Sequence, residues 1–421
     1  MVKSGPRSGP GIAAESLEEK GLFNEKMRKT SGGDVCGTNT FVMRLLLLTA
    51  STGGGHDMRA RSFAQWAQRD PQGTEVVVHQ TLESTAGLYR FGVGLYNWIQ
   101  RTAPRLHHLY FNWLEIFRPC GDARRLVGRE TFASALRAAA PDAVISVHGS
   151  LNHGFFEVVR EVLGPRVPRI TYCGELFGGY GFSKNWVNPK ADLFIGAVPE
   201  ICDAARALGM PESRIWCGGF MLNPDFYEAD HGPDARDLFL RETLGLDPVR
   251  PTLLLSTGAV GANNHADFVR ALESAGLPLQ VLAVCGRNTV ARTSLATLAR
   301  SLRQVKLTPL GYRDDMRRIM QSVTAIVARP GTGTTSEAVM AGCPILFNGI
   351  GGVMPQEGIT LKWAKLHGLG ALIRKATDLV PLARALVEQT DWAKDQRAKL
   401  SAVLPQQSPL AILEKCRSLI R

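Results

Sequence analysis

Short apolar runs alternate with amphipathic stretches along most of this chain. The first run, Met43 to Ala50, has the length of a strand and predicts a buried parallel strand. A glycine-rich turn over 51–56 follows it. Apolar residues at helical spacing then predict a helix over 57–68. Strand, glycine-rich turn and helix together form the beginning of a βαβ unit.

The same alternation recurs on both sides of a segment rich in Asn, Pro, Asp and Gly. The further predicted strands are 75–79, 143–147, 169–173, 192–197, 214–218, 252–256, 280–285, 305–309, 325–328 and 344–347. The predicted helices between them are 155–163, 200–208, 264–275, 295–302, 313–321 and 335–341. Two halves that each alternate strand and helix predict an α/β protein with two Rossmann-like, doubly wound domains facing a cleft.

The length of 421 residues is too great for one compact core, which supports this division. We expect a disordered tail, an N-terminal domain, a linker, a C-terminal domain and a final helix, at 1–40, 41–222, 223–231, 232–402 and 403–421. The tail lacks the apolar core of a secretory signal. Met43, at the first strand, would also be a sensible translation start.

The stretch 88–117 departs from the alternation. Aromatic residues are interleaved with arginines in it, and Pro104 divides it into two amphipathic segments. We expect these segments to face a lipid surface in the headgroup region. The alternative is an aromatic-rich helical pair buried in the first domain.

The formal net charge of +11 favours an anionic partner, which could be a nucleic acid, an acidic membrane or a phosphorylated substrate. No zinc-finger, helix-turn-helix or RNP pattern supports nucleic acid. No run reaches the roughly 20 apolar residues that span a bilayer. The eight cysteines include no CxxC pair and fit reduced thiols. Net charge alone does not choose between a membrane and a phosphorylated substrate. Together with the stretch 88–117, it leads us to expect a cytoplasmic protein, peripheral on the inner face of the cytoplasmic membrane.

The first motif is Thr49-Ala-Ser-Thr-Gly-Gly-Gly-His56. Glycines after a strand allow close approach of a ligand, and the following helix offers N–H donors at its start. His56 could act as general base on an acceptor hydroxyl. A capping residue in an ordinary βα loop is the alternative, and the motif alone does not decide between them.

The second motif is Arg329-Pro-Gly-Thr-Gly-Thr-Thr-Ser-Glu337, also after a predicted strand. Its glycines and threonines, beside a helix start, favour a diphosphate. Glu337 could accept both ribose hydroxyls, although a first-turn acid that stabilises the helix is the commoner reading of such a residue.

Three weaker signals follow strands or helices in the second half, and each alone also fits solvated loop residues. They are Cys285-Gly-Arg-Asn288, Gly311-Tyr312 and Met354-Pro-Gln-Glu357. Arg287 offers a planar fork for phosphate, and the backbone at Tyr312 could pair with a base edge. The pair His148 and His153 lacks a third metal ligand, and no Asp-x-Asp occurs. We therefore expect no metal.

The order of these motifs resembles that of the monogalactosyl- and processive glucosyl-diacylglycerol synthases, relatives of the peptidoglycan lipid-intermediate N-acetylglucosaminyltransferase. The resemblance runs from about Met43 to about Gly370 and is strongest over 285–357. The segment 185–192 resembles a tryptophan-containing segment of that family, and 88–117 looks like its lipid-facing insert. The resemblance implies the two-Rossmann GT-B glycosyltransferase architecture, inversion at the anomeric carbon, and no essential metal or cofactor.

The resemblance assigns roles residue by residue. His56 would be the catalytic base, and Gly54, Gly55, Glu175 and Trp186 would lie on the acceptor side. The donor nucleotide would be bound by Gly286, Arg287, Asn288, Tyr312, Gly331, Thr332, Gly333, Thr334 and Glu337, and the donor sugar by Gln356 and Glu357.

This chain departs from the family pattern at three places. Cys173-Gly-Glu-Leu176 stands where the family usually has Thr-Asp-Phe/Leu, on the acceptor side. Pro355 replaces a glycine before the donor-sugar pair, and Arg329 replaces a lysine before the diphosphate loop.

The resulting hypothesis is transfer of a hexose or N-acetylhexosamine from a UDP-sugar co-substrate to the hydroxyl of a membrane lipid resembling diacylglycerol. The partners would be the UDP-sugar, the lipid and an anionic membrane surface, without nucleic acid. Acceptors of the polyprenol-linked or lipid-A type are alternatives, as is a UDP-sugar 2-epimerase of the same fold.

Overall fold

The computed structural model describes residues 42–102, 106–256, 264–388 and 391–420. The predicted tail 1–40 and Pro104 lie outside the described residues. Within these ranges the strands form two six-stranded sheets, and the neighbouring strands of both sheets run parallel. The prediction of two Rossmann-like halves is thereby confirmed.

The first sheet has the order β2-β1-β3-β4-β5-β6. Its strands are β1 (Met43–Thr49), β2 (Thr74–Gln80), β3 (Ala143–Ser146), β4 (Arg169–Cys173), β5 (Leu193–Gly196) and β6 (Ile215–Cys217). The second sheet has the order β12-β11-β10-β7-β8-β9. Its strands are β7 (Thr252–Ser256), β8 (Gln280–Val284), β9 (Lys306–Leu310), β10 (Ala325–Ala328), β11 (Ile345–Asn348) and β12 (Ala371–Ile373).

Helices follow the strands in both halves. In the first half they are α2 (Gly55–Gln68), α3 (Thr81–Thr85), α4 (Gly87–Thr102), α5 (His107–Phe117), α6 (Arg129–Ala139), α7 (Gly154–Leu163) and α8 (Pro199–Ala207). The remaining helices are α9 (Pro233–Leu238), α10 (His265–Ser274), α11 (Thr289–Ala299), α12 (Met316–Ser322), α13 (Thr332–Met340), α14 (Pro355–Leu366), α15 (Leu379–Val387), α16 (Trp392–Ala402) and α17 (Pro409–Arg417).

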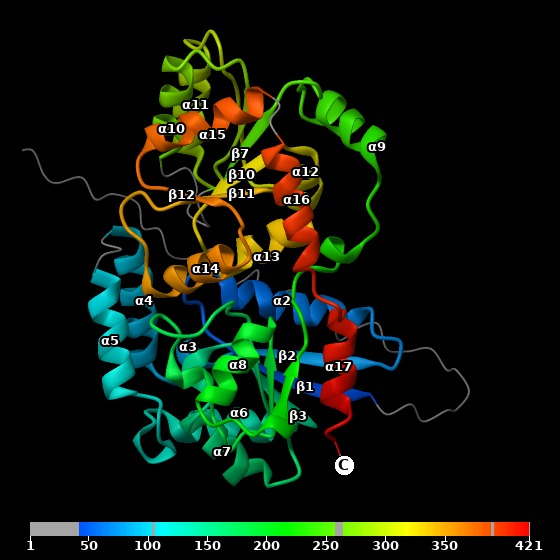
Figure 1. Cartoon of the computed structure of the whole chain (residues 1–421). Helices are drawn as coiled ribbons and strands as arrows, with labels where there is room; N and C mark the ends of the chain where they lie inside the picture. The colour runs from blue at the N-terminus through cyan, green and yellow to red at the C-terminus, as the bar shows by residue number, and fades with distance from the viewer. Residues whose placement is uncertain (1–41, 103–105, 257–263, 389–390, 421) are drawn as a thin grey trace, which may run out of the picture. The chain divides into compact units, whose positions relative to one another are not determined.

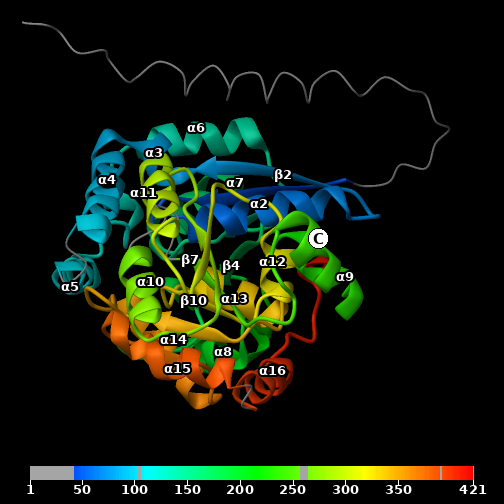
Figure 2. The same ribbon diagram turned by 90° about the horizontal axis from the view of Figure 1, so that it is seen from above.

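The first strand shows why the sheets have helices on both faces. Leu45 and Leu47 pack with α2 residues in one apolar cluster, whereas Leu46 and Leu48 pack with α6 residues in another. Successive side chains of a strand point to opposite faces, so a run of leucines needs cover on each side. Figure 2 shows α6 and α2 on opposite sides of the sheet edge β2.

Two predicted helices begin earlier than the periodicity indicated. α11 begins at Thr289 instead of 295, because the Asn288 side chain accepts a hydrogen bond from the Ala291 N–H (2.9 Å) and caps the helix. α13 begins at Thr332 instead of 335, so the threonines expected in a loop form its first turn. Helix α6 and strand β12 were not predicted.

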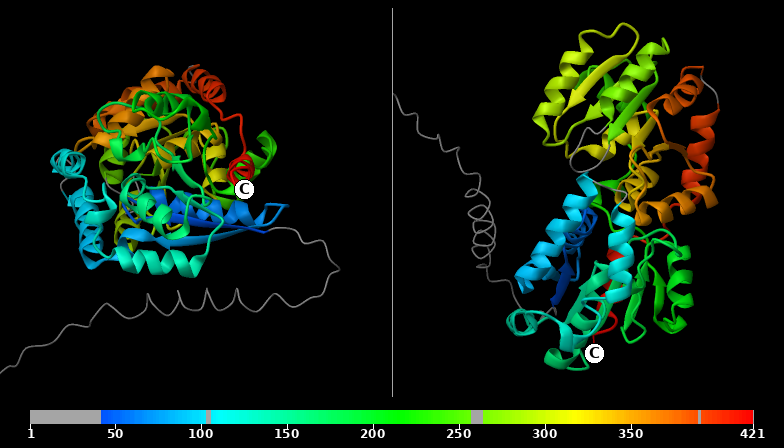
Figure 3. Two further views of the ribbon diagram at one scale, coloured as in Figure 1. Left: turned by 90° about the horizontal axis from the view of Figure 1, so that it is seen from below. Right: turned by 90° about the vertical axis from the view of Figure 1, so that its left-hand side faces the viewer.

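The last helix, α17, returns to the first half of the chain. Ile412, Leu413 and Cys416 are fully buried in one cluster with residues of β1 and α2. Figure 1 shows α17 beside α2, and Figure 3 shows the C-terminus next to the first half. The boundaries expected for domains, linker and terminal helix stay predictions.

The predicted segments within 88–117 are the helices α4 and α5. Among the described residues, no helix combines the length and apolar character that crossing a membrane requires.

Candidate active site

The candidate site lies where loops leave the carboxyl ends of both sheets. β1 pairs with β2 on one side and β3 on the other, so the loops after β1 and β3 diverge. Such a topological switch point is the usual ligand site of an open parallel sheet. A cavity of about 1450 Å³ lies there, and residues 51–59 and 329–334, together with Met354, Gln356 and Glu357, contribute to its wall. Both glycine-rich motifs therefore face one cavity.

The glycines of the first loop have backbone conformations that other residues adopt rarely. Gly53 and Gly54 have φ angles of 72° and 81°, and α2 begins immediately afterwards. Asn97 of α4 holds this loop, since its side chain accepts from the Gly53 N–H (3.0 Å) and donates to the Ser51 carbonyl (2.8 Å). The loop is thus held by a residue of α4 that lies 44 positions after Gly53 in the sequence.

His56, in the first turn of α2, is fixed in one tautomer. Its Nδ1 lies 2.7 Å from the carbonyl oxygen of Val147, which can only accept, so Nδ1 carries the proton. Burial, His148 and Arg59 hold the pKa of His56 well below its usual value, and the Val147 bond offsets only part of this. The ring is therefore neutral near pH 7, with an unprotonated Nε2 that can accept a proton.

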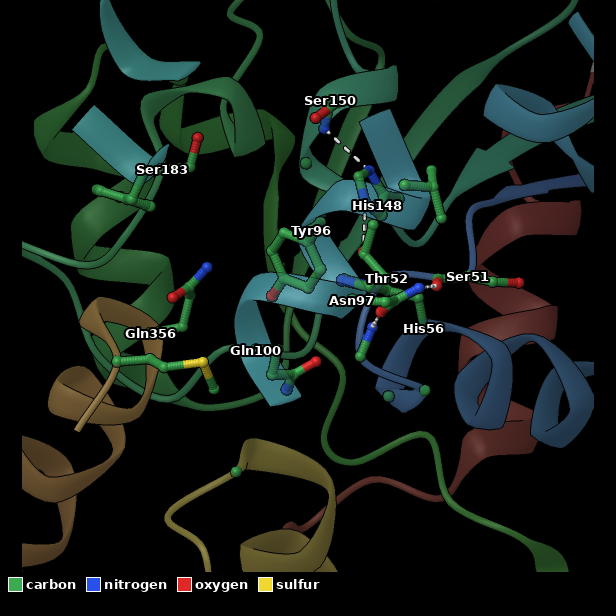
Figure 4. Close-up of a pocket in the computed structure, with 18 of the residues that line it drawn as sticks. Ser51, Thr52, His56, Tyr96, Asn97, Gln100, His148, Ser150, Ser183 and Gln356 are labelled. Carbon is green, nitrogen blue, oxygen red and sulfur yellow. Dashed lines mark hydrogen bonds between the residues drawn. The ribbon is translucent and has the colours of Figure 1, made fainter. Parts of the chain in front are cut away.

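His148, in the loop after β3, packs against His56 with 4.5 Å between ring centroids. Its Nδ1 accepts from the Ser150 N–H (3.2 Å), so its Nε2–H donates to the Thr52 hydroxyl (2.9 Å). Figure 4 shows His56, His148 and Thr52 on one side of the cavity and Gln356 on the other. With both ring nitrogens engaged, His148 positions the loop and His56, and is no candidate base.

The acceptor-side residues predicted from the sequence all line this cavity: Gly54, Gly55, Glu175 and Trp186. The ring of Trp186 is buried and lies 5.9 Å from that of His56. Burial raises the pKa of Glu175, and the positive charge of Arg59 lowers it in part. Oε2 of Glu175 is buried and meets no hydrogen-bond partner within the described part of the chain.

The second glycine-rich motif forms the start of α13, with Gly331 as its N-cap residue. The predicted diphosphate residues Gly331, Thr332, Gly333 and Thr334 line the cavity, as does Glu337. Gly333 has no room for a side chain without displacing Met58 of α2, whose Cε would lie 3.2 Å from an added Cβ. Burial raises the pKa of Glu337 to about 7.

Gln356 and Glu357, at the start of α14, differ in how their side chains are engaged. Glu357 accepts from Arg329 Nε (2.9 Å) and from the Met354 N–H (2.9 Å), which anchors it. Gln356 lines the cavity, and its buried Oε1 has no partner among the described residues. The arginine that replaces the family's lysine thus holds Glu357 in place.

Four residues predicted to bind the nucleotide do not line the cavity: Gly286, Arg287, Asn288 and Tyr312. The Arg287 guanidinium stacks over the exposed Tyr312 ring, 5.8 Å from its centroid. The Asn288 side chain serves as the cap of α11. All four residues follow β8 or β9, at one edge of the second sheet. Their expected contacts with the nucleotide stay predictions.

Sequence reasoning missed several residues that line the cavity. Tyr96, Asn97 and Gln100 of α4 lie in its wall, and so does Arg59 of α2. Arg59 comes three residues after His56, a spacing that places two side chains on the same face of a helix. That spacing was the available signal for Arg59, whereas nothing in the sequence placed α4 over the glycine loop.

No family model matches this chain. In sequence it is similar to "Probable monogalactosyldiacylglycerol synthase 2, chloroplastic" of Oryza sativa subsp. japonica, with 27% identity over 336 residues, 74% of this chain and 67% of that protein. It is also similar to "Processive diacylglycerol beta-glucosyltransferase" of Staphylococcus carnosus, with 27% identity over 228 residues, 52% of this chain and 56% of that protein. These matches confirm the resemblance inferred from the motifs.

Solved structures agree in fold. MurG of Acinetobacter baumannii superposes with a TM-score of 0.57 and 16% identity, over 89% of this chain and 99% of that chain. The calicheamicin glycosyltransferase CalG4 superposes with a TM-score of 0.55 and 15% identity, over 90% of this chain and 98% of that chain. HepE of Anabaena in complex with UDP and glucose superposes with a TM-score of 0.52 and 15% identity, over 89% of this chain and 98% of that chain. The chain is therefore similar in sequence to the diacylglycerol glycosyltransferases and has the two-Rossmann GT-B fold of sugar transferases.

Proposed function

We propose that this protein is a UDP-sugar-dependent glycosyltransferase that moves a hexose or N-acetylhexosamine to the hydroxyl of a membrane lipid resembling diacylglycerol. The observation that carries this proposal is the shared cavity. A neutral His56 with a free Nε2 lone pair faces it from the first half, and the start of α13 faces it from the second. A base and a diphosphate-binding helix start are the two parts that sugar transfer from a nucleotide requires.

The donor side has groups suited to a UDP-sugar. The N–H groups at the start of α13 favour a diphosphate, and the threonine hydroxyls of 332 and 334 add donors. The Glu337 carboxylate, one turn further on, suits ribose hydroxyls. The Gln356 Oε1, which meets no partner in the described part of the chain, suits a hydroxyl of the sugar.

The acceptor side opens beneath helices with a large exposed apolar surface. Phe91 and Trp98 of α4 and Leu109, Ile116 and Phe117 of α5 are between 56% and 74% exposed. A patch of this kind marks an interaction site, and a lipid surface is the partner that the glycolipid-synthase names of the relatives favour. The inner faces of the same helices line the cavity, which would bring a lipid hydroxyl to His56.

In the proposed reaction, the acceptor oxygen attacks the anomeric carbon from the face opposite the diphosphate. The O–H proton passes to Nε2 of His56 while the new C–O bond forms. The bond between the anomeric carbon and the diphosphate oxygen breaks, and its electron pair leaves with UDP. Attack from the opposite face inverts the configuration, and the step uses no metal or redox cofactor.

The proposal is tested by incubating purified protein with a panel of UDP-sugars and defined lipids, and identifying the product by mass spectrometry and its anomeric configuration by NMR. Addition of EDTA should leave the rate unchanged. Diacylglycerol, polyprenol phosphate and a lipid-A precursor are offered separately, so that the acceptor class is decided directly. Conversion of a UDP-sugar to its epimer without acceptor would support the epimerase instead.

His56→Ala should lower transfer about 100- to 10,000-fold, the usual contribution of a positioned general base. The affinity for UDP, measured by calorimetry, should change less than twofold. The matched control is His231→Ala, which changes an exposed histidine outside the cavity. Near-normal transfer by His56→Ala would show that His56 is not the base.

A further inference from the structure

Arg59 places a positive charge beside the diphosphate loop from the opposite half of the protein. It lies on α2, three residues after His56, and its side chain is buried in the cavity wall. Its Nη2 donates to the Thr332 hydroxyl (2.7 Å) and to the Gly174 carbonyl (2.8 Å). The guanidinium thus contacts the first residue of α13, 273 positions further along the chain.

The space for this guanidinium depends on Gly174. A Cβ added at Gly174 would lie 2.1 Å from Arg59 Nε and 2.4 Å from its Cζ. A side chain there and Arg59 in this position therefore exclude each other.

The acid next to Gly174 lies within the electrostatic influence of the buried charge. The Arg59 guanidinium lowers the pKa of the Glu175 carboxyl, which burial raises, so the two charges act on each other. An arginine has five N–H donors in a planar fork, and the two bonds described above both come from Nη2. Nη1 lies 3.9 Å from where a Cβ of Gly55 would be, which places it beside the first glycine loop.

We propose that Arg59 is a catalytic residue that contacts the donor diphosphate and stabilises the negative charge that develops on the leaving nucleoside diphosphate. The proposal rests on the proposed function, and it gives Arg59 the role that the sequence suggested for Arg287. When the bond between the anomeric carbon and the diphosphate oxygen breaks, the electron pair moves onto that oxygen. A guanidinium already held against Thr332 meets this charge without reorganisation.

This arrangement couples the two ends of the reaction through one helix. His56 and Arg59 are one turn apart on α2, so the base at the acceptor oxygen and the cation at the leaving oxygen have a fixed separation. Arginine suits the second role, because its fork binds phosphate oxygens in pairs and stays charged at every working pH.

The test compares UDP with uridine, which lacks both phosphates, by calorimetry on the full chain. Arg59→Ala should weaken UDP binding about 10- to 100-fold, the usual effect of a lost charge-assisted hydrogen bond. Uridine affinity should stay within twofold. The rate constant kcat should fall about 100-fold. Arg59→Lys should recover part of the UDP affinity, since it restores the charge without the fork.

A matched variant and the comparison with uridine separate catalysis from a structural tie between the halves. Arg69→Ala removes an exposed arginine at the end of the same helix and should leave both affinities within twofold. If Arg59 only ties α2 to α13, Arg59→Ala will weaken UDP and uridine together. That result would overturn the proposal, as would an unchanged UDP affinity in Arg59→Ala.

The outcomes also distinguish this inference from the proposed function. A wild-type protein that binds neither UDP nor a UDP-sugar would refute the proposed function itself. A wild-type protein that binds UDP, with an Arg59→Ala variant that binds it equally well, would refute only the role of Arg59. Thermal unfolding of each variant shows whether it is folded, and Arg59→Met keeps the buried chain length if Arg59→Ala unfolds.

Discussion

At the scale of single residues, Glu337 combines an unfavourable burial with a useful position. Burial raises its pKa from 4.5 to about 7. The folded protein therefore binds this proton more tightly than the unfolded chain does. The free energy of unfolding therefore falls as the pH rises from about 4.5 to 7. Above 7 the full cost of ionising the buried Glu337 carboxyl is reached. A shift of this size corresponds to roughly 3 kcal/mol at most.

Glu337→Gln should therefore raise the melting temperature at pH 8 and leave it nearly unchanged at pH 5, where the wild-type carboxyl is mostly protonated. The same variant should bind UDP about tenfold more weakly at pH 8, because hydrogen bonds to an ionised carboxylate exceed those to an amide. Thermal scans and calorimetry at both pH values measure this, with the exposed Glu388→Gln as control. An equal change in melting temperature at pH 5 and pH 8 would contradict the role of ionisation.

At the scale of elements, α4 and α5 contribute side chains both to the cavity wall and to the outer surface. Their inner side chains, such as Tyr96 and Tyr110, line the cavity, whereas Leu109, Ile116 and Phe117 are exposed and do not line it. Exposed arginines at positions 90, 118, 124 and 125 accompany the apolar side chains. Apolar side chains with basic neighbours are typical of a helix that lies in the headgroup region of an anionic membrane.

Replacing Leu109, Ile116 and Phe117 together by serine should weaken binding to phosphatidylglycerol vesicles at least 100-fold, since each buried apolar side chain contributes roughly 1.5–3 kcal/mol. UDP affinity and transfer to a detergent-dispersed acceptor should be retained, because these three exposed side chains do not line the cavity. Vesicle co-sedimentation measures the binding. Val249→Ser with Val290→Ser, which are exposed outside these helices, is the control. Unchanged sedimentation of the triple variant would exclude this surface as the membrane contact.

At the scale of the whole molecule, the last helix, α17, packs against the first half of the chain. Leu413 is fully buried among residues of the first sheet and α2, and Arg417 donates to the Thr74 hydroxyl (2.9 Å) and pairs with Asp70. The second half is therefore connected to the first by the segment before α9 and again by the segment before α17.

Leu413→Ala should destabilise the first half by about 2–5 kcal/mol, the cost of a cavity in a packed core. Hydrogen exchange should then quicken in β1 and α2, where Leu413 packs, more than in β7 and β10. Glu414→Ala changes the exposed neighbour and serves as control. Equal exchange in both sheets would mean that α17 does not stabilise the first half selectively.

The sequence by itself determined the features that depend on neighbouring residues. Apolar runs of strand length gave three strands with their observed bounds, Arg169–Cys173, Thr252–Ser256 and Ala325–Ala328. The positive φ angles of Gly53 and Gly54 were predictable as a tight turn, because glycine adopts them without strain. His56 was identifiable because it directly follows that turn.

Only the tertiary structure decided which side chains share the cavity. Arg59 meets Thr332 across 273 positions, α4 covers the glycine loop, and Arg287 lies at a sheet edge away from the cavity. Contacts of this kind depend on strand order and on the packing of distant helices, which local periodicity does not encode. The two arginines carry the same charge, and only the fold places Arg59 beside Thr332 and Arg287 outside the cavity wall.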